Sequence, residues 1–176
     1  MIYLIVGNSG SGKTTQAKLL QKKNNFNKII TYTTRPIRSD EINNVDYHFV
    51  NTEQFKDLSN KNELTGITKF SNNYYGISKK ELDYYKNSNK NCVLIVDLKG
   101  VKELKNEFNA ICIYLKANND NLLKRMQHRN EHSDILKLRM ECIEDFSPYA
   151  DYTINADKSI EEVNNEISKI VEKHLK

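Results

Sequence analysis

The sequence has few cysteines, and they do not cluster. The three are Cys92, Cys112 and Cys142, and the first two lie within apolar, strand-like runs. Their spacing is typical neither of a zinc site nor of a disulfide framework. Structural disulfides are rare in reducing compartments, so this usage of cysteine favours a cytoplasmic protein.

Long hydrophobic runs are also missing. No apolar stretch approaches the roughly 20 residues that a membrane-spanning helix needs. The first residues lead directly into a glycine-rich stretch, without the basic segment that opens a signal peptide. The net charge of +4 is spread along the chain and forms no basic block. We therefore expect neither a membrane nor a nucleic acid among the partners.

Arginine is scarce among the basic residues. Lysines and arginines together number 27, and only five of them are arginines, namely Arg35, Arg38, Arg125, Arg129 and Arg139. The lysine excess is typical of a codon bias, so arginines that persist against it favour places where a planar, bidentate phosphate donor is needed. Chance placement is the alternative, but two tight groupings favour phosphate binding for most of them.

One stretch fits a phosphate-binding motif at every fixed position. Residues Gly7-Asn8-Ser9-Gly10-Ser11-Gly12-Lys13-Thr14 match G-x-x-x-x-G-K-[ST]. An apolar run at 2–6 precedes them and is typical of a buried strand, and a helix-like segment at 16–23 follows. A glycine-rich turn with a chance lysine is the alternative, but strand, loop and helix together are the context that the motif requires.

This loop predicts a nucleotide site with assigned roles. Its glycines let backbone N–H groups turn toward phosphate oxygens, next to the positive end of the helix. Lys13 is expected to reach the β- and γ-phosphates, and the Thr14 hydroxyl is expected to bind Mg²⁺. The residues expected to bind the nucleotide here are Gly7, Ser9, Gly10, Ser11, Gly12, Lys13, Thr14 and Thr15.

Short apolar runs alternate with helix-like segments along the rest of the chain. Strands are expected at 29–31, 45–50, 64–70, 92–97, 110–115 and 152–154. Helices are expected at 52–58, 78–86, 100–108, 119–128 and 135–146, and a capping box at Ser159 opens the last one. The alternation predicts an α/β fold, with a central parallel sheet and helices on both faces. No repeat or linker is visible, so one domain is expected over 1–176.

The middle of the chain, from about 33 to 89, interrupts this pattern. It is rich in tyrosine and in short strands, which is typical of an insert. It opens with a polar loop around Pro36, in which Arg35 and Arg38 stand three residues apart among hydroxyl side chains. We interpret these two arginines as an anion clamp.

Four stretches, taken in order, resemble the guanylate kinase family. They are residues 7–15, Thr33-Thr34-Arg35-x-x-Arg38-x-x-Glu41, Asp46-Tyr47-x-Phe49 and Asn73-Tyr74-Tyr75-Gly76. The resemblance implies a three-layer α/β/α P-loop NTPase fold with its core at 1–32, 90–127 and 141–176, an insert at about 33–89 that binds the nucleoside monophosphate, and a helical lid at about 128–140. It also implies an ATP-dependent guanylate kinase that uses Mg²⁺ and converts GMP or dGMP and ATP to the diphosphate and ADP.

The resemblance implies roles around the acceptor. Arg35 and Arg38 match arginines that grip the acceptor phosphate, and Tyr47 and Tyr75 match tyrosines whose hydroxyls donate to it. Thr31 stands where a serine meets the guanine edge. Judged by sequence alone, the tyrosines and Thr31 are more typical of residues that pack in strands.

Further roles are implied around the transferred phosphoryl group. Arg129 and Arg139 match lid arginines, although their spacing alone suits solvated helix charges equally well. Arg125 lies one turn before Arg129, and Asn155 matches a residue near the adenine, although it is also typical of a turn. Asp97 ends an apolar strand, where a carboxylate near the magnesium or the substrate is favoured over a simple cap. The expected catalytic residues are Lys13, Arg38, Arg129 and Arg139.

The sequence departs from the family pattern where the base is read. Gly66 stands where a guanine-binding glutamate is expected, and Ile95 replaces an aspartate two residues before Asp97. Phosphate handling therefore looks intact, while base recognition looks altered. We expect GMP to be read by Asp97 and Thr31 with weak discrimination, and we expect Gly66→Glu to sharpen it unless Gly66 needs a positive φ.

Two other interpretations remain open. A related P-loop kinase could phosphorylate another nucleoside monophosphate or small molecule, and a non-catalytic guanylate-kinase-like module could use the insert for docking. A pure docking module has no need of Lys13, Thr14 or the lid arginines, so the sequence favours a kinase. Monomer and homodimer stay equally open.

Overall fold

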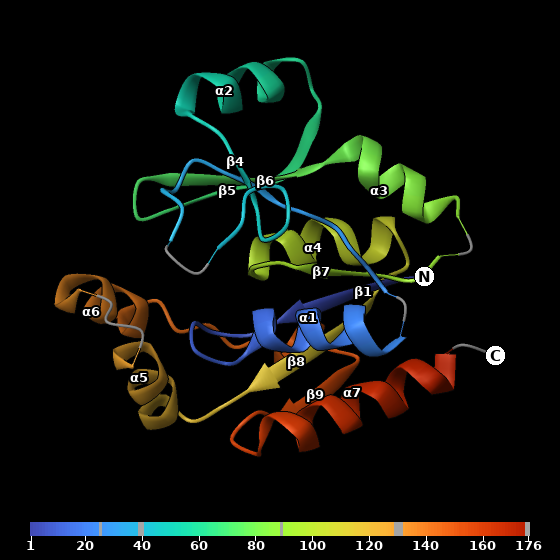
Figure 1. Ribbon diagram of the computed structural model, residues 1–176, viewed down its shortest axis with the longest axis vertical. Coiled ribbons are helices and arrows are strands. Elements are labelled where there is room, and N and C mark those ends of the chain that lie inside the picture. The colour runs from blue at the N-terminus through green and yellow to red at the C-terminus, as the bar shows by residue number, and fades with distance from the viewer. Residues whose placement is uncertain (25, 39–40, 89, 129–131, 175–176) are drawn as a thin grey trace.

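A five-stranded parallel sheet forms the centre of the computed structural model, which describes residues 1–24, 26–38, 41–88, 90–128 and 132–174 (Figure 1). The strand order is β2-β7-β1-β8-β9. The strands are β1 (Ile2–Val6), β2 (Asn27–Lys28), β7 (Cys92–Ile95), β8 (Ile111–Lys116) and β9 (Tyr152–Asn155). Because all are parallel, their carboxyl ends share one edge of the sheet, where open α/β proteins bind ligands.

Helices cover both faces of this sheet. Residues of β1 alternate between two hydrophobic clusters, so that Leu4 packs with α4 (Leu98–Glu107) while Ile5 packs with α1 (Lys13–Asn24) and α7 (Ile160–His174). All five residues of β1 are buried, as a strand covered on both faces requires. The predicted α/β fold with three layers is confirmed.

A second sheet is built from residues of the predicted insert, together with Tyr32 just before it. Its order is β4-β3-β6-β5, and Figure 1 shows it above the core sheet. The strands are β3 (Tyr32–Thr33), β4 (His48–Phe49), β5 (Leu64–Phe70) and β6 (Asn73–Ser78), accompanied by α2 (Thr52–Asn60) and α3 (Lys79–Lys86). Ile77 and Leu82 join Leu104 of α4 in one cluster, so this sheet rests on the core. The exact division into core, insert and lid stays a prediction.

The remaining helices lie at one side of the core, where α5 (Asn119–Gln127) and α6 (Ser133–Glu141) are neighbours (Figure 1). A short 3₁₀ helix follows at Ser147–Tyr149. In the described part of the chain no helix combines the length and the apolar character that a membrane span requires.

Several helix starts follow the expected capping chemistry. Ser159 and Glu162 form a reciprocal capping box, and the Ser78 hydroxyl accepts from the Glu81 N–H. Asn51 caps α2, because its side chain bonds with Gln54 in a full capping box. Asp97 caps α4, so this helix starts two residues earlier than expected.

Three predicted elements are wrong in position or extent. The strand expected at 29–31 instead joins β2 to β3, because the chain changes partners there: the Ile29 N–H still bonds the Val93 carbonyl beside β2, whereas the Thr31 carbonyl already accepts from the His48 N–H of β4. The strand expected at 45–50 is reduced to His48–Phe49, because the Asn44 N–H bonds the Tyr47 carbonyl in a turn. The helix expected at 135–146 ends at Glu141. Beyond it, the Asn8 side chain takes both backbone groups of Glu144, which leaves them unavailable to a helix.

Candidate active site

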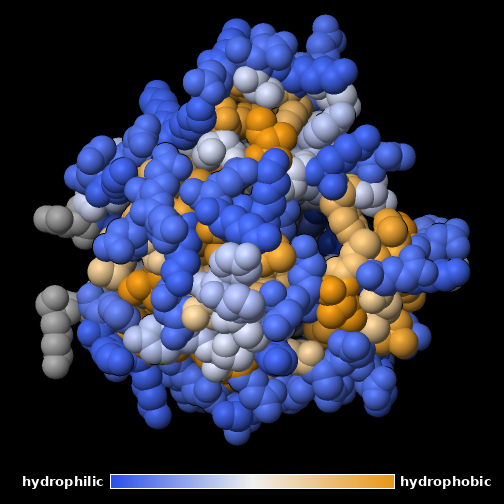
Figure 2. Space-filling view, turned by 180° about the vertical axis from the view of Figure 1, so that it is seen from behind, coloured by the Kyte–Doolittle hydropathy of each residue, from blue (hydrophilic) through white to orange (hydrophobic). Residues whose placement is uncertain are grey.

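A cleft of about 620 Å³ opens where the carboxyl edge of the core sheet meets the predicted insert. The glycine-rich loop, the β3–β4 connection, the β5–β6 hairpin, the end of β7 and the segment at 139–146 all contribute to its walls. Figure 2 shows the surface hollowed between the upper and lower parts of the molecule. A cavity of this size is typical of a small-molecule site.

The glycine-rich loop runs from the end of β1 to the first turn of α1 and forms one wall. Gly12 has φ +92°, a conformation that side chains rarely allow, and a Cβ there would meet no atom within 4 Å. Lys13 Nζ donates to the carbonyls of Gly7 at 2.6 Å and Asn8 at 3.0 Å, which folds the lysine over the loop. The Ser11 hydroxyl is buried without a hydrogen-bond partner among the described residues. The open space at Gly12, the ammonium group of Lys13 and the amino end of α1 together form a site that can bind an anion.

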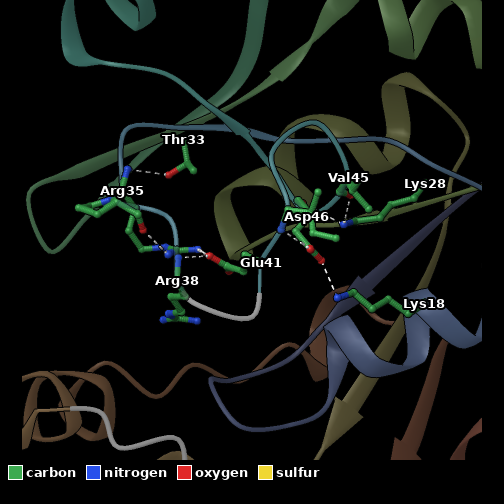
Figure 3. Close-up of polar contacts among 10 residues, drawn as sticks. Lys18, Lys28, Thr33, Arg35, Arg38, Glu41, Val45 and Asp46 are labelled. Carbon is green, nitrogen blue, oxygen red and sulfur yellow. Dashed lines mark hydrogen bonds and ion pairs between the residues drawn. The ribbon is translucent and has the colours of Figure 1, made fainter.

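The two loop arginines behave differently, as Figure 3 shows. Arg35 Nη2 donates to both carboxylate oxygens of Glu41, at 2.7 and 2.9 Å, and its guanidinium lies over the rings of Tyr47 and Phe49. Burial lowers the pKa of Arg35, but the hydrogen bond and charge of Glu41 outweigh it, so the pKa is raised. The Arg38 backbone N–H also donates to Glu41, and its exposed side chain lines the cleft. Arg35 is therefore rigidly held, while Arg38 presents its side chain to the cleft.

Tyr47 and Tyr75 lie beside these arginines, with ring centroids 6.4 Å apart, and both line the cleft. Burial and the neighbouring Tyr75 raise the pKa of Tyr47, against a lowering effect of Arg35. Its hydroxyl therefore stays protonated near neutral pH and can donate a hydrogen bond. Thr31 also lines the cleft, and its carbonyl accepts from the His48 N–H at 3.0 Å.

Asp46 fastens this loop to the core. Its side chain is 3% exposed, one oxygen lies 2.7 Å from Lys18 Nζ of α1, and the other accepts from the Ile42 N–H. Lys28 of β2 donates to the carbonyls of Val45 and Asp46 (Figure 3). The aspartate thus positions the segment that carries Tyr47, a role that the sequence did not indicate.

Arg139 of α6 lies on the cleft wall opposite the insert, and its side chain contacts the glycine-rich loop. Its Nη1 donates to the Ser9 hydroxyl at 2.8 Å, and its guanidinium carbon lies 5.9 Å from the ring centroid of Phe70 on β5. Arg139 therefore touches both the loop and the insert. Arg129, its predicted partner, falls outside the described residues.

Two other candidates lie behind the loop. Arg125 donates to the carbonyls of Gly10 at 3.3 Å and Ala156 at 2.8 Å, so it braces the loop against the end of β9. Asn155 is exposed, and its side chain accepts from the Asp157 N–H. Neither lines the cleft, and neither do Ser11 and Thr15.

The structure brings the other predicted residues together. Those that line the cleft are Gly7, Ser9, Gly10, Gly12, Lys13, Thr14, Thr31, Arg35, Arg38, Tyr47, Tyr75, Asp97 and Arg139. Sequence reasoning missed Asn8, Thr68, Lys69, Phe70, Cys142 and Glu144, which also line it. Asn8 stands inside the recognised motif and could have been noticed there, but no local pattern marks Glu144.

Gly66 does need a positive φ, so the condition attached to the expected effect of Gly66→Glu fails. Its φ is +58°, and a Cβ would lie 3.0 Å from Ile77 Cδ1. The register of β5 against β6 shifts between Thr65 and Thr68, which places Gly66 in a bulge. A glutamate at this position would be strained, and its effect on base recognition could not be separated from that strain.

The acidic residues on the cleft are few. Among the described residues that line it, the carboxylates are Asp97 and Glu144. Asp97 Oδ1 accepts from the Gly100 N–H at 2.8 Å, so the residue both caps α4 and borders the cleft. No group of three His, Cys, Asp or Glu side chains in the described part of the chain is arranged to hold a metal ion.

Comparisons with known proteins point in one direction. The sequence model of the guanylate kinase family matches residues 1–174. A guanylate kinase of Fusobacterium nucleatum is 31% identical over 182 residues, covering 99% of this chain and 97% of the relative. A guanylate kinase of Chlamydia trachomatis is 30% identical over 139 residues, covering 77% and 68%. The crystal structure of guanylate kinase from Anaplasma phagocytophilum superimposes with a TM-score of 0.76 at 24% identity, covering 99% of this chain and 86% of that one, and supports the fold.

Proposed function

The chain belongs to the guanylate kinase family, and from this premise we propose that it transfers the γ-phosphate of ATP to GMP, giving ADP and GDP. One observation carries the proposal beyond family membership. The anion-binding loop and the arginine-bearing loop of the insert line one cleft, although they belong to different sheets of the fold. A phosphoryl-transfer enzyme needs this arrangement, because donor and acceptor phosphates must meet in line.

The donor side fits the triphosphate of ATP. The open face of Gly12 and the amino end of α1 offer N–H groups, and Lys13 adds a positive charge. The exposed Thr14 side chain borders the cleft and fits a Mg²⁺ ion held mainly by phosphate oxygens, which agrees with the small number of carboxylates there. When bound, the ion supplies charge neutralisation at the β- and γ-phosphates.

The acceptor side fits the phosphate of a nucleoside monophosphate. We assign the direct grip to Arg38, supported by the hydroxyls of Tyr47 and Tyr75, while Arg35, held by its pair with Glu41, borders the cleft beside them. The attacking oxygen belongs to an already ionised phosphate, so no strong general base is required.

The transition state needs positive charge around the transferred phosphoryl group. Lys13 and Arg139 both border the cleft, from α1 and α6, and fit this role, with Arg129 as the further predicted contributor. Water must be excluded to prevent ATP hydrolysis, so we propose that the insert and the α5–α6 region close over both substrates. Small-angle scattering with a bisubstrate analogue tests this closure, and an unchanged radius of gyration would contradict it.

The cysteines bear on the compartment in which this reaction takes place. We place it in the cytoplasm, without nucleic acid or membrane as a partner. Cys92 and Cys112 are buried as free thiols, and burial raises their pKa to about 12 and about 11. They are therefore inert packing residues, which agrees with a protein that needs no disulfide.

The proposed activity is tested by ADP release from ATP and Mg²⁺ across GMP, dGMP, IMP, AMP, CMP and UMP. GMP should be the best acceptor, and Lys13→Ala should abolish turnover without unfolding the protein. Lys22→Ala, an exposed lysine on the same helix, is the matched control and should behave as wild type. Absence of turnover with every acceptor would instead favour the docking-module alternative.

A further inference from the structure

The carboxylates of the cleft support an inference about base recognition, which rests on the proposed function. Guanine presents two adjacent donors, N1–H and the 2-amino group, whereas adenine has an acceptor at N1 and no 2-amino group. An ionised carboxylate only accepts hydrogen bonds, so carboxylate oxygens suit guanine and leave adenine unmatched. The hydroxyls of Thr31 and Thr68 can donate as well as accept, so they cannot supply this distinction.

Position 66 cannot supply the reading group, because it is a glycine held at φ +58°. Asp97 alone supplies only part of it, since its Oδ1 already accepts from the Gly100 N–H. Glu144 is the second carboxylate on the cleft among the described residues. None of the ion pairs found among those residues includes Glu144.

The backbone of Glu144 is anchored to the phosphate-binding loop. The Asn8 side-chain amide donates to the Glu144 carbonyl at 2.9 Å, and its oxygen accepts from the Glu144 N–H at 2.9 Å. These two bonds span 136 residues of sequence and hold position 144 in a fixed relation to the loop. The side chain therefore leaves the backbone at a defined point on the cleft wall.

Glu144 also lines a second, smaller cavity of about 430 Å³, which lies between β5 and the start of α4. Thr68, Lys69, Asp97 and Glu144 line both cavities and so form their common boundary. Glu144 thus lies near Asp97, close to the strand in which Gly66 stands. Partial burial and the charge of Asp97 raise the pKa of Glu144, against lowering by Lys102 and the Leu98 N–H, which agrees with two carboxylates sharing one space.

We propose that Glu144 and Asp97 together read the donor edge of guanine, so that Glu144 replaces the reading group that is absent at position 66. Thr68 borders the same space as a neutral neighbour. Glu144 is then a specificity-determining residue, and Asn8 is a positioning residue that acts through it.

Glu144→Gln tests the proposal with kcat/KM measured for GMP, IMP and AMP. The substitution keeps the size of the side chain but turns one acceptor into a donor. The GMP-to-AMP ratio should fall about 10- to 100-fold, as expected for lost hydrogen bonds to a charged group, while the KM of ATP stays unchanged. Because IMP lacks only the 2-amino group, a smaller loss for IMP than for GMP would assign that group to Glu144. Glu141→Gln, an exposed acidic residue at the end of α6 that does not line the cleft, is the matched control.

A GMP-to-AMP ratio that survives Glu144→Gln would overturn the proposal, and so would a wild-type protein that uses GMP and AMP equally. Glu144→Asp keeps the charge on a shorter side chain and should retain more of the ratio than Glu144→Gln, so an equal or lower ratio would also contradict it. Thermal unfolding of each variant identifies any loss of folding. Absence of wild-type turnover with all three nucleotides would refute the proposed function instead, so the two failures are distinguishable.

Discussion

Replacing Gly66 with alanine should destabilise the protein although it adds only one methyl group. At φ +58° an alanine pays a steric penalty of roughly 1–2 kcal/mol. The new Cβ would also lie 3.0 Å from Ile77 Cδ1, so the buried Ile77 side chain must shift by a few tenths of an ångström. The lower entropy of the unfolded chain offsets about 0.4–1 kcal/mol of this cost.

The net loss should therefore be about 1–2 kcal/mol of unfolding free energy once the contact with Ile77 is included. For a domain of this size, that lowers Tm by about 2–8 °C. Gly66→Asn is the matched variant, because asparagine brings a similar Cβ but tolerates a positive φ better than alanine does. Gly66→Asn should therefore lower the free energy of unfolding less than Gly66→Ala does, although asparagine has the larger side chain.

Urea unfolding of both variants, followed by circular dichroism, measures the difference. An alanine variant as stable as wild type, or an asparagine variant that is less stable than alanine, would refute the argument from backbone conformation. The same measurement shows why Gly66→Glu is an unsuitable probe of base recognition.

Other substitutions test separate parts of the site. Arg38→Lys should raise the KM of GMP and leave that of ATP unchanged, because one bidentate donor becomes a point charge; an equal rise in both would contradict the acceptor-side assignment. Burial raises the pKa of Asp46, but hydrogen bonds from Lys18 and the backbone, with nearby lysine charge, lower it below 3.8 overall. Asp46→Asn should cost about 1.5–3 kcal/mol of unfolding free energy at neutral pH. Because the pKa of Asp46 is lower in the folded protein than in the unfolded chain, its ionised form stabilises the fold above pH 3.8, and this stability is lost as the pH falls through the folded pKa. The difference in unfolding free energy between wild type and Asp46→Asn should therefore shrink below pH 3.8. A difference that does not depend on pH would contradict this. Phe70→Leu removes the aromatic face beside Arg139 and should lower kcat several-fold with little change in either KM, in line with about 0.5–2 kcal/mol for such contacts; an effect confined to the KM of GMP would contradict it.

The fold could be predicted because its signals are local. Continuous apolar runs such as 2–6 are typical of strands buried on both faces, and Ser159 with Glu162 marks a helix start within four residues. The glycine-rich motif is likewise contiguous, so the order of residues along the chain is enough to place the loop between a strand and a helix.

The rest depends on contacts between distant residues. The end of α6 is set by Asn8, which lies 136 residues before the backbone groups that it binds. The same contact brings Glu144 to the cleft, and no periodicity around 144 could reveal it. The conformation of Gly66 arises from a bulge in the pairing of β5 with β6, which composition does not encode.

The transfer itself is best tested by following the γ-phosphate. ATP labelled at this phosphate should pass its label to GMP, so that label appears in GDP at the rate at which ADP forms, and Lys13→Ala should stop both. Label recovered as inorganic phosphate would mean hydrolysis, and label retained in ATP would mean no reaction. Either result, obtained with folded protein, GMP and Mg²⁺ present, would contradict the proposal that the two phosphate sites of this cleft serve one phosphoryl transfer.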